Sequence, residues 1–293
     1  MKLTLNDILD FIKVRIAVAV AISSIVGYVL AAHSMDYDII LLFFAIFLLA
    51  AGSASLNQVQ EWRYDSLMLR TKYRPIPSKK ITGKEGFLFS SFLLALGLII
   101  LLIYGIWNSN FVPFYLGILA IVFYNVVYTP LKRITPYAAL PGAFIGAIPP
   151  AIGWTFASGN LLHPQLLLLS LFFFVWQMPH FWLLLIMYEE DYRRAGYPLI
   201  SDKLSKHQLS RISFFWIFSL VMIAFLIPIS GHQSNLYTLL IMFLLGAYLI
   251  VRSIKLVKVV HLPVEYYRFT FIQLNFFVLL ISLILTFNKF LNL

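Results

Sequence analysis

Long apolar stretches alternate with short polar connections along almost the whole chain. A helix rises about 1.5 Å per residue, so about 20 apolar residues cross the hydrocarbon core of a bilayer. The pattern predicts an all-α polytopic membrane protein, in which residues 1–293 form a single integral membrane domain. We expect nine membrane-spanning helices, at 11–31, 39–57, 87–107, 111–128, 137–157, 165–187, 213–230, 236–252 and 269–287.

The composition excludes a water-soluble globular protein. Of the 293 residues, 61% are hydrophobic and only 12% are charged, and the mean hydropathy is +0.88. The chain has no cysteine, which excludes disulfides, thiolate metal sites and cysteine nucleophiles. Any chemistry must therefore come from oxygen and nitrogen groups.

The net charge of +10 is concentrated on one side of the predicted membrane domain. Of the 22 lysines and arginines, all but Lys289 lie near the N-terminus or in connections that follow even-numbered spans. The positive-inside rule predicts that the N-terminus and these connections are cytoplasmic. Charges at the leading edge of the first span, with no cleavage site after it, predict a retained helix and not a signal peptide.

Most acidic residues lie on this same side, and the exceptions are Asp36 and Asp38. A basic face that only met lipid head groups would have little use for carboxylates. We therefore expect a cation-binding site there. An anionic substrate and the bilayer, and not nucleic acid, are the expected partners of the basic side chains.

The end of the second span carries a stripe of oxygen ligands. Asn57, Glu61 and Asp65 follow one another at intervals of four residues, so they share one helical face. Mg²⁺ uses few protein carboxylates and completes its coordination with water and phosphate oxygens, so the stripe suits a metal with a phosphorylated ligand. A helix end with solvated charges is an equally good interpretation of these three residues alone.

The next loop shifts this balance toward a diphosphate site. Arg70 and Arg74 flank Thr71, and the planar guanidinium group is suited to phosphate. Alone, such a loop more often signals only topology. Beside the acidic stripe we favour phosphate binding.

A second acidic cluster, Glu189, Glu190 and Asp191, stands at the same predicted end of the sixth span. Two clusters from different helices can share metal ions across one diphosphate. Three consecutive carboxylates cannot all face one way, so we rank Asp191 first as a ligand, Glu190 second and Glu189 third. For Glu189, a solvated helix terminus is a fair alternative.

Two further spans carry unusual residues. Gly142 and Gly146 in the fifth span allow close helix packing, and Pro149 and Pro150 are expected to kink or break that span and so shape a cavity. For the glycines, packing alone is a sufficient explanation.

The sixth span contains Gln177 and His180, which are costly at hydrocarbon depth and so suggest a function. His180 is a candidate contact for an acceptor substrate. A structural histidine bonded to backbone freed by Pro179 is an equally good interpretation. Trp176 fits an interfacial belt equally well.

Taken together, these blocks resemble the UbiA superfamily of intramembrane prenyltransferases, and within it the enzymes that farnesylate haem. The resemblance covers residues 57–200 by motif and the nine spans by layout. The marks shared with the superfamily are the first acidic motif with Arg70, Thr71, Arg74 and Pro75. The narrower marks are Tyr128, Thr129, Leu131, Lys132, Arg133, Thr135, Gly146, Ala147, Pro149, Pro150, Gly153, Trp154, Trp176, Gln177, Pro179, His180, Phe181, Trp182, Asp191, Tyr192, Ala195 and Gly196.

The resemblance implies an activity: transfer of the farnesyl group of farnesyl diphosphate to haem B, with addition of water, to give haem O and diphosphate. It implies that Mg²⁺ is the cofactor and that the active site faces the cytoplasm of a bacterial plasma (inner) membrane. It also implies partners, which are farnesyl diphosphate, haem B as substrate, the bilayer, and haem A synthase or a terminal oxidase assembly.

The resemblance also assigns roles to residues. The implied catalytic residues are Asn57, Glu61, Asp65 and Asp191; the metal ligands add Glu190; the diphosphate donors are Arg70, Arg74, Lys132 and Arg133; and the acceptor contacts are Trp176, Gln177 and His180. The sequence departs from the family pattern at Glu61, where aspartate is usual, and at Ala138, where asparagine is common. These departures leave the metal geometry and one polar cavity contact open.

Two rival functions remain. A prenyltransferase of the same superfamily with a quinone precursor or another aromatic acceptor would keep the diphosphate site and change the acceptor cavity. A transporter is less favoured, because the acidic clusters lie on one side and no repeat of broken helices is evident.

Overall fold

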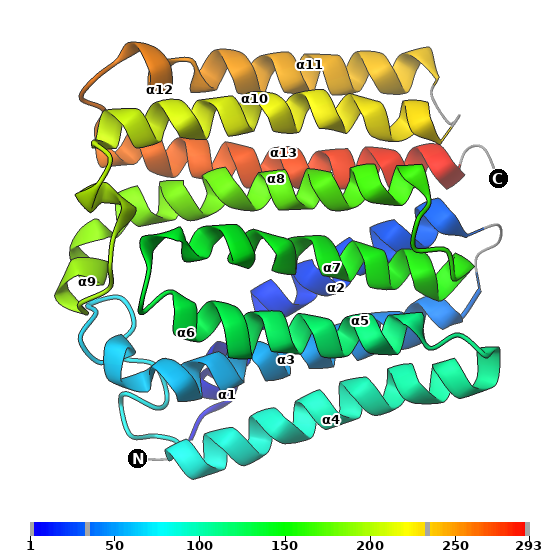
Figure 1. Ribbon diagram of the computed structural model, residues 1–293, viewed down its shortest axis with the longest axis horizontal. Helices are drawn as coiled ribbons and strands as arrows, with labels where there is room; N and C mark the ends of the chain where they lie inside the picture. Colours follow the sequence, from blue (N-terminus) through cyan, green and yellow to red (C-terminus); the bar gives the residue numbers. More distant parts are fainter. Residues whose placement is uncertain (1–2, 33–35, 232–234, 291–293) are drawn as a thin grey trace.

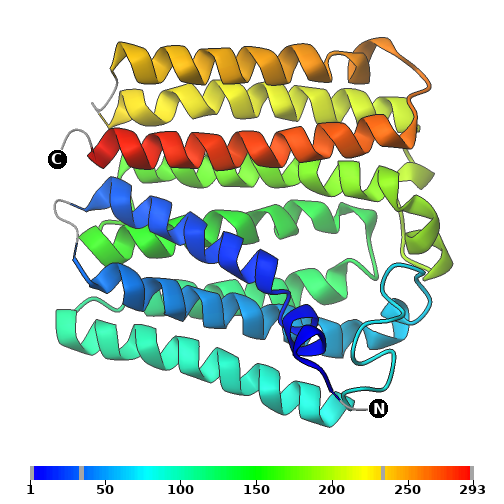
Figure 2. The same ribbon diagram turned by 180° about the vertical axis from the view of Figure 1, so that it is seen from behind.

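The computed structural model describes residues 3–32, 36–231 and 235–290. Lys2, one of the basic residues that the sequence assigns to the cytoplasmic side, lies outside these ranges. Within these ranges the chain is helical and has no strands, and nine helices are long and apolar enough to cross a membrane (Figures 1 and 2). The predicted all-α membrane architecture is therefore confirmed.

The elements run in this order: α1 (Leu5–Phe11), α2 (Val14–Ala31), α3 (Asp38–Asp65), α4 (Gly83–Asn108), α5 (Val112–Ile121), a π-helical segment (Val122–Tyr128), α6 (Thr129–Leu131), a short 3₁₀ helix (Pro136–Ala138), α7 (Ala139–Ser158), α8 (Pro164–Met187), α9 (Glu189–Arg194), a second 3₁₀ helix (Ile200–Asp202), α10 (Lys206–Ser230), α11 (Leu236–Ser253), α12 (Lys255–Lys258) and α13 (Val264–Phe290).

Several helices extend beyond their predicted spans at the end of the bundle that carries the charges. The second span was expected to end at residue 57, but α3 continues to Asp65, and α10 begins at Lys206, seven residues before its predicted start. Hydropathy reports only the part of a helix at hydrocarbon depth, whereas the backbone stays helical while its hydrogen bonds continue. The extension of α3 places the whole predicted oxygen stripe on one regular helix.

The first predicted span is wrong at its start, because the chain breaks between α1 and α2. Lys13 has a left-handed backbone with φ 47°. On α3, Gln58 Nε2 donates to the carbonyl oxygens of Asp10 and Phe11 at 3.0 and 2.9 Å. It thereby satisfies carbonyl groups at the end of α1 from another helix.

The long helices run roughly along a common direction and form two groups (Figures 1 and 2). One group contains α8, α10, α11 and α13; the other contains α2 to α7, and the groups meet where α7 packs against α8 and α2 against α13. Both views place α1, α9, α12 and the loop after α3 at the same end of the bundle. The structure thus gathers the basic connections on one face, as the sequence predicts.

Of the two effects expected of the paired prolines, a kink or a break, the break does not occur, and α7 runs unbroken through Pro149 and Pro150. Its glycine face allows backbone contact with α2. A Cβ at Gly153 would lie 1.7 Å from the Ser24 carbonyl oxygen, and a Cβ at Gly27 would lie 2.0 Å from the Pro150 carbonyl oxygen. Two helices can approach this closely only through glycine.

The α2–α7 contact gives a stability prediction. We expect Gly153→Ala to lower the free energy of unfolding by about 1–3 kcal/mol or more, because the added methyl meets backbone that cannot rotate away. Thermal unfolding in detergent measures the loss. Gly83→Ala is the control, since a Cβ added at Gly83 would meet nothing within 4 Å. Equal unfolding temperatures for the two variants would show that α2 and α7 can move apart to accept the methyl group without loss of stability.

Candidate active site

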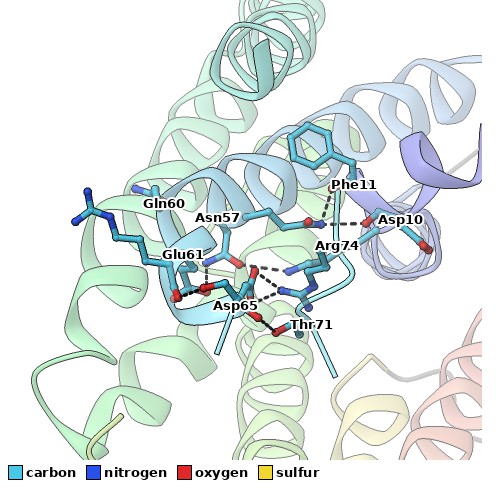
Figure 3. A network of polar contacts seen from close by, with 12 residues as sticks. Asp10, Phe11, Asn57, Gln60, Glu61, Asp65, Thr71 and Arg74 are labelled. Atoms are coloured by element: carbon cyan, nitrogen blue, oxygen red, sulfur yellow. Dashed lines mark hydrogen bonds and ion pairs between the residues drawn. The ribbon is translucent and has the colours of Figure 1, made fainter. Parts of the chain in front are cut away.

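The predicted oxygen stripe on α3 is buried beneath the loops at the charged end of the bundle (Figure 3). Asn57, Glu61 and Asp65 are only 3%, 3% and 4% exposed. Asn57 Nδ2 donates to Glu61 Oε2 at 2.9 Å, so the first two ligands of the stripe are already joined. Buried carboxylates require opposite charges or hydrogen bonds.

Asp65 obtains its opposite charge from the loop that follows it in sequence. Arg74 Nη1 lies 2.8 Å from both Asp65 Oδ1 and Oδ2 (Figure 3). Thr71 Oγ1 donates to the Asp65 backbone carbonyl at 2.9 Å, which folds the loop back over the helix end. The structure therefore brings the predicted acidic stripe and the predicted phosphate loop together.

Glu61 is held by two side chains from other parts of the chain. Lys132 Nζ lies 2.5 Å from Glu61 Oε2, and the Tyr197 hydroxyl donates to Oε1 at 3.1 Å. Burial, followed by the nearby Glu61 charge, raises the pKa of Tyr197 well above its ordinary value, so the hydroxyl remains a donor. Thr129 Oγ1 accepts from Asn57 Nδ2 at 3.0 Å.

Lys13 also reaches the stripe, although the sequence suggested only a topology role. Its Nζ donates to Asn57 Oδ1 at 3.3 Å. Burial lowers the pKa of the Lys13 ammonium to about 7, and the Arg74 and Lys132 charges contribute to the same shift. An anion bound beside these three cations would favour the charged form of Lys13.

The π-helical segment Val122–Tyr128, which leads into α6, packs against α3. Asn125 Nδ2 donates to the Ser53 carbonyl at 3.0 Å, and Gln60 Nε2 donates to the Asn125 carbonyl at 2.9 Å. A π-turn inserts extra chain into a helix and often occurs at functional sites. Here it fixes the register that carries Lys132 to Glu61.

The second acidic cluster lies at the same end of the bundle and touches the first. Asp191 Oδ1 accepts from the Leu69 amide at 3.0 Å, and Oδ2 accepts from the Arg70 amide at 3.2 Å. The contact joins α9 to the loop after α3. The two helix ends therefore converge, but the Asp191 carboxylate is engaged by the loop backbone.

The other two members of that cluster point elsewhere. Glu189 pairs with Lys206 at 2.9 Å and with Arg193 at 3.1 Å, so its carboxylate is held by ion pairs at the helix end, and Glu190 is exposed. Across the described ranges, no three aspartates, glutamates or histidines gather closely enough to hold a metal ion by themselves. A metal here would need Asn57 and substrate oxygens as ligands.

The remaining predicted phosphate donors lie around the site. The exposed Arg70 guanidinium lies over the Tyr188 ring, 4.5 Å from its centroid. Arg133 turns toward the outer side of α3, where its Nη2 donates to the Gln60 carbonyl at 2.6 Å and its guanidinium lies 4.9 Å from the Tyr64 ring centroid. An open hollow of about 520 Å³ lies there, lined by Gln60, Trp62, Arg63, Tyr64, Leu67 and Arg133.

The predicted acceptor residues lie within α8. His180 Nδ1 is 3.0 Å from Asn275 Oδ1 on α13, so its partner is a side chain and not the backbone freed by Pro179. Trp176 and His180 meet edge to face at 5.1 Å. The side chain of Gln177 lies against Gly146, where a Cβ would be 2.7 Å from Gln177 Cγ.

A line of aromatic rings connects this region to the polar site. Phe181 stacks on Tyr128 with centroids 5.9 Å apart, and Lys132 Nζ lies 5.6 Å from the Tyr128 centroid. The arrangement places an apolar, aromatic-lined region next to partly buried cations and buried carboxylates. Such a site can bind an amphipathic diphosphate with its head at the polar end.

The donor set fits a hard divalent cation together with a diphosphate. The amide oxygen and carboxylates of the α3 stripe are the ligand types that Mg²⁺ prefers. Lys13, Arg74 and Lys132 face only the two carboxylates Glu61 and Asp65 in this network. The surplus positive charge suits an anionic ligand.

Tyr197 is a contact that the sequence gave no signal for. We expect Tyr197→Phe to reduce turnover several-fold, because Glu61 loses a hydrogen bond of about 1.5–3 kcal/mol but keeps its pairing with Lys132. Steady-state rates with saturating substrates measure the effect. Tyr137→Phe, at a ring that is 57% exposed, is the control. Identical rates for both variants would mean that Tyr197 does not orient Glu61.

Comparison with known proteins identifies the family. The sequence profile of the UbiA prenyltransferase family matches residues 20–285. A protoheme IX farnesyltransferase of Nitratidesulfovibrio vulgaris is 35% identical over 225 residues, which cover 77% of each chain. A protoheme IX farnesyltransferase of Geobacter sulfurreducens is 35% identical over 232 residues, which cover 79% of this chain and 84% of that one.

Solved structures share the fold. A structure of digeranylgeranylglyceryl phosphate synthase matches with a TM-score of 0.77 at 19% identity, covering 97% of this chain and 98% of that one. A UbiA homolog from Archaeoglobus fulgidus bound to GPP and Mg²⁺ matches with a TM-score of 0.68 at 13% identity, covering 97% and 98%. At these identities the similarity establishes the helical architecture.

Proposed function

The chain belongs to the UbiA prenyltransferase family, and we propose that it transfers the farnesyl group of farnesyl diphosphate to haem B, with water as co-substrate. One new carbon–carbon bond joins farnesyl C1 to a vinyl carbon of haem B, and the C1–oxygen bond to diphosphate breaks. Water adds its oxygen to the other vinyl carbon and releases a proton. The products are haem O and diphosphate.

The observation that carries this proposal is the buried network on α3. Two carboxylates, one amide oxygen and three cations meet at the polar end of an aromatic-lined membrane bundle. A site that only stabilised the helix ends would pair each charge once. The third cation, Lys13, has no carboxylate partner in this network and instead suits the diphosphate of an amphipathic substrate whose prenyl tail lies between the helices.

We assign the following roles within this site. Arg74 and Lys132 donate to the diphosphate as negative charge builds on it, and Arg70 and Arg133 attract it from the edge of the site. Asn57, Glu61 and Asp65 on α3, with Asp191 and then Glu190 on α9, are the proposed Mg²⁺ ligands. When bound, Mg²⁺ would neutralise the departing diphosphate. The buried setting keeps bulk water from the allylic carbon as it gains cationic character.

The acceptor side of the proposal rests on α8. We assign haem B contacts to Trp176, Gln177 and His180, and we expect basic side chains at the bundle end to attract the haem propionates. We place the active site at the cytoplasmic face of a bacterial inner membrane, since the basic connections gather at this end. The product would pass to haem A synthase or to a terminal oxidase assembly.

The direct test is reconstitution. Purified protein in lipid nanodiscs receives farnesyl diphosphate, Mg²⁺ and either haem B or 4-hydroxybenzoate, and mass spectrometry identifies the product. We expect haem O from the first mixture and no product from the second. Prenylated 4-hydroxybenzoate without haem O would favour the aromatic-acceptor alternative, which the same diphosphate site also supports.

Removal of divalent metal tests the cofactor assignment. We expect chelation to reduce haem O formation to background and added Mg²⁺ to restore it. The lysine and arginine side chains of the site do not by themselves neutralise the charge of a leaving diphosphate. Product formation that is undiminished after chelation would contradict the metal site. Haem B binding, measured by absorption, should survive chelation and serves as the control for folding.

A further inference from the structure

His180 on α8 is tied to Asn275 on α13 by a hydrogen bond whose direction can be deduced. His180 Nδ1 lies 3.0 Å from Asn275 Oδ1. The other end of the same amide, Asn275 Nδ2, donates to the Phe271 carbonyl at 2.6 Å. A flipped amide would place two acceptor oxygens against each other there, so the amide orientation is fixed by its own helix.

This orientation determines the tautomer of His180. The Asn275 amide oxygen can only accept, so His180 Nδ1 must carry the proton and donate. A neutral imidazole protonated at Nδ1 has its lone pair on Nε2. The amide thus acts as the outer partner that commonly fixes the ring orientation of a metal-binding histidine.

Three aromatic rings contact the His180 ring. Phe271 lies 4.7 Å from the His180 centroid, and Trp176 and Phe181 meet the ring edge to face. The Trp176 Nε1 atom is buried and has no hydrogen-bond acceptor among the described residues. A buried donor left unpaired on a ring that contacts His180 is expected where a ligand completes the site.

We propose that Asn275 is a positioning residue that holds His180 with Nε2 directed to coordinate the iron of the haem substrate. The inference rests on the proposed function and adds to it the way in which the acceptor is oriented. Coordination at iron would fix the macrocycle in the bilayer, so that one vinyl group faces the prenyl carbon. No bond is made or broken at His180 during transfer.

The test is the spectrum of haem B bound to purified protein in nanodiscs, without farnesyl diphosphate. We expect ferrous haem to show an iron–histidine stretching band in resonance Raman, and His180→Ala to lose it. Asn275→Leu should shift and broaden this band and weaken haem binding about 10–100-fold, the usual cost of losing an outer partner.

Gln273→Leu is the matched control. It removes an amide two residues away on α13, where Gln273 Nε2 donates to the Tyr248 hydroxyl at 2.9 Å, and it should leave band and affinity unchanged. A native spectrum in Asn275→Leu, or an unchanged band in His180→Ala, would overturn the proposal. Haem O formation by the native protein is measured separately, so the proposal can fail while the proposed function stands.

Discussion

Asp65→Asn is expected to abolish haem O formation, with a loss of at least about 100-fold in kcat. Asp65 is 4% exposed, and both of its carboxylate oxygens lie 2.8 Å from Arg74 Nη1. The amide keeps the shape but removes the negative charge that the proposed metal requires. It also leaves Arg74 without its ionic partner, so diphosphate capture by the loop should weaken.

The measurement is haem O formed by purified variants in nanodiscs, at saturating farnesyl diphosphate and haem B. Asp202→Asn is the matched control, because Asp202 is an exposed aspartate at the same end of the bundle that pairs with Arg193 at 2.9 Å. It should retain native activity. Thermal unfolding of each variant separates lost chemistry from lost folding, and a folded Asp65→Asn protein with native activity would remove Asp65 from the site.

The features that could be predicted from the sequence are those set by local periodicity. The nine spans follow from runs of apolar residues, and the α3 stripe follows from the helical repeat that connects Asn57, Glu61 and Asp65. The gathering of basic loops at one end follows from alternation of the spans. None of these features depends on how one helix packs against another.

The contacts that escaped prediction depend on packing between distant segments. Lys13 looked like a topology signal, because its approach to Asn57 requires the break that Gln58 stabilises from another helix. Tyr197 reaches Glu61 across 136 positions of sequence. No local pattern encodes such a distance.

One expectation was met only in part. Paired prolines were expected to kink or break α7, and the helix continues through them without a break, with backbone contacts to α2 at Pro150 and Gly153. The role of Asp191 as a ligand beside Asp65 stays a prediction, and in the structure its two oxygens accept from the loop amides of Leu69 and Arg70. Both features depend on tertiary contacts that local sequence does not encode.

Lys132→Met is the second substitution with a large expected effect. Lys132 Nζ lies 2.5 Å from Glu61 and 5.6 Å from the centroids of Tyr128 and Tyr197. Methionine keeps the length of the apolar stem but removes the charge. We expect kcat to fall about 100-fold, since the lysine would stabilise charge on the departing diphosphate, and KM for farnesyl diphosphate to rise.

The substitution also leaves Glu61 without its cation, so folding and chemistry must be separated. The double variant Glu61→Gln with Lys132→Met removes both charges, and we expect its unfolding temperature to return toward the native value while its activity stays at background. Lys203→Met is the control, because this exposed lysine also lies over a tyrosine ring, 4.9 Å from the Tyr137 centroid, but outside the site. Native turnover in a folded Lys132→Met protein would limit Lys132 to a structural partner of Glu61. Lost turnover with an unchanged unfolding temperature would instead show that the Lys132 charge acts directly on the reacting diphosphate.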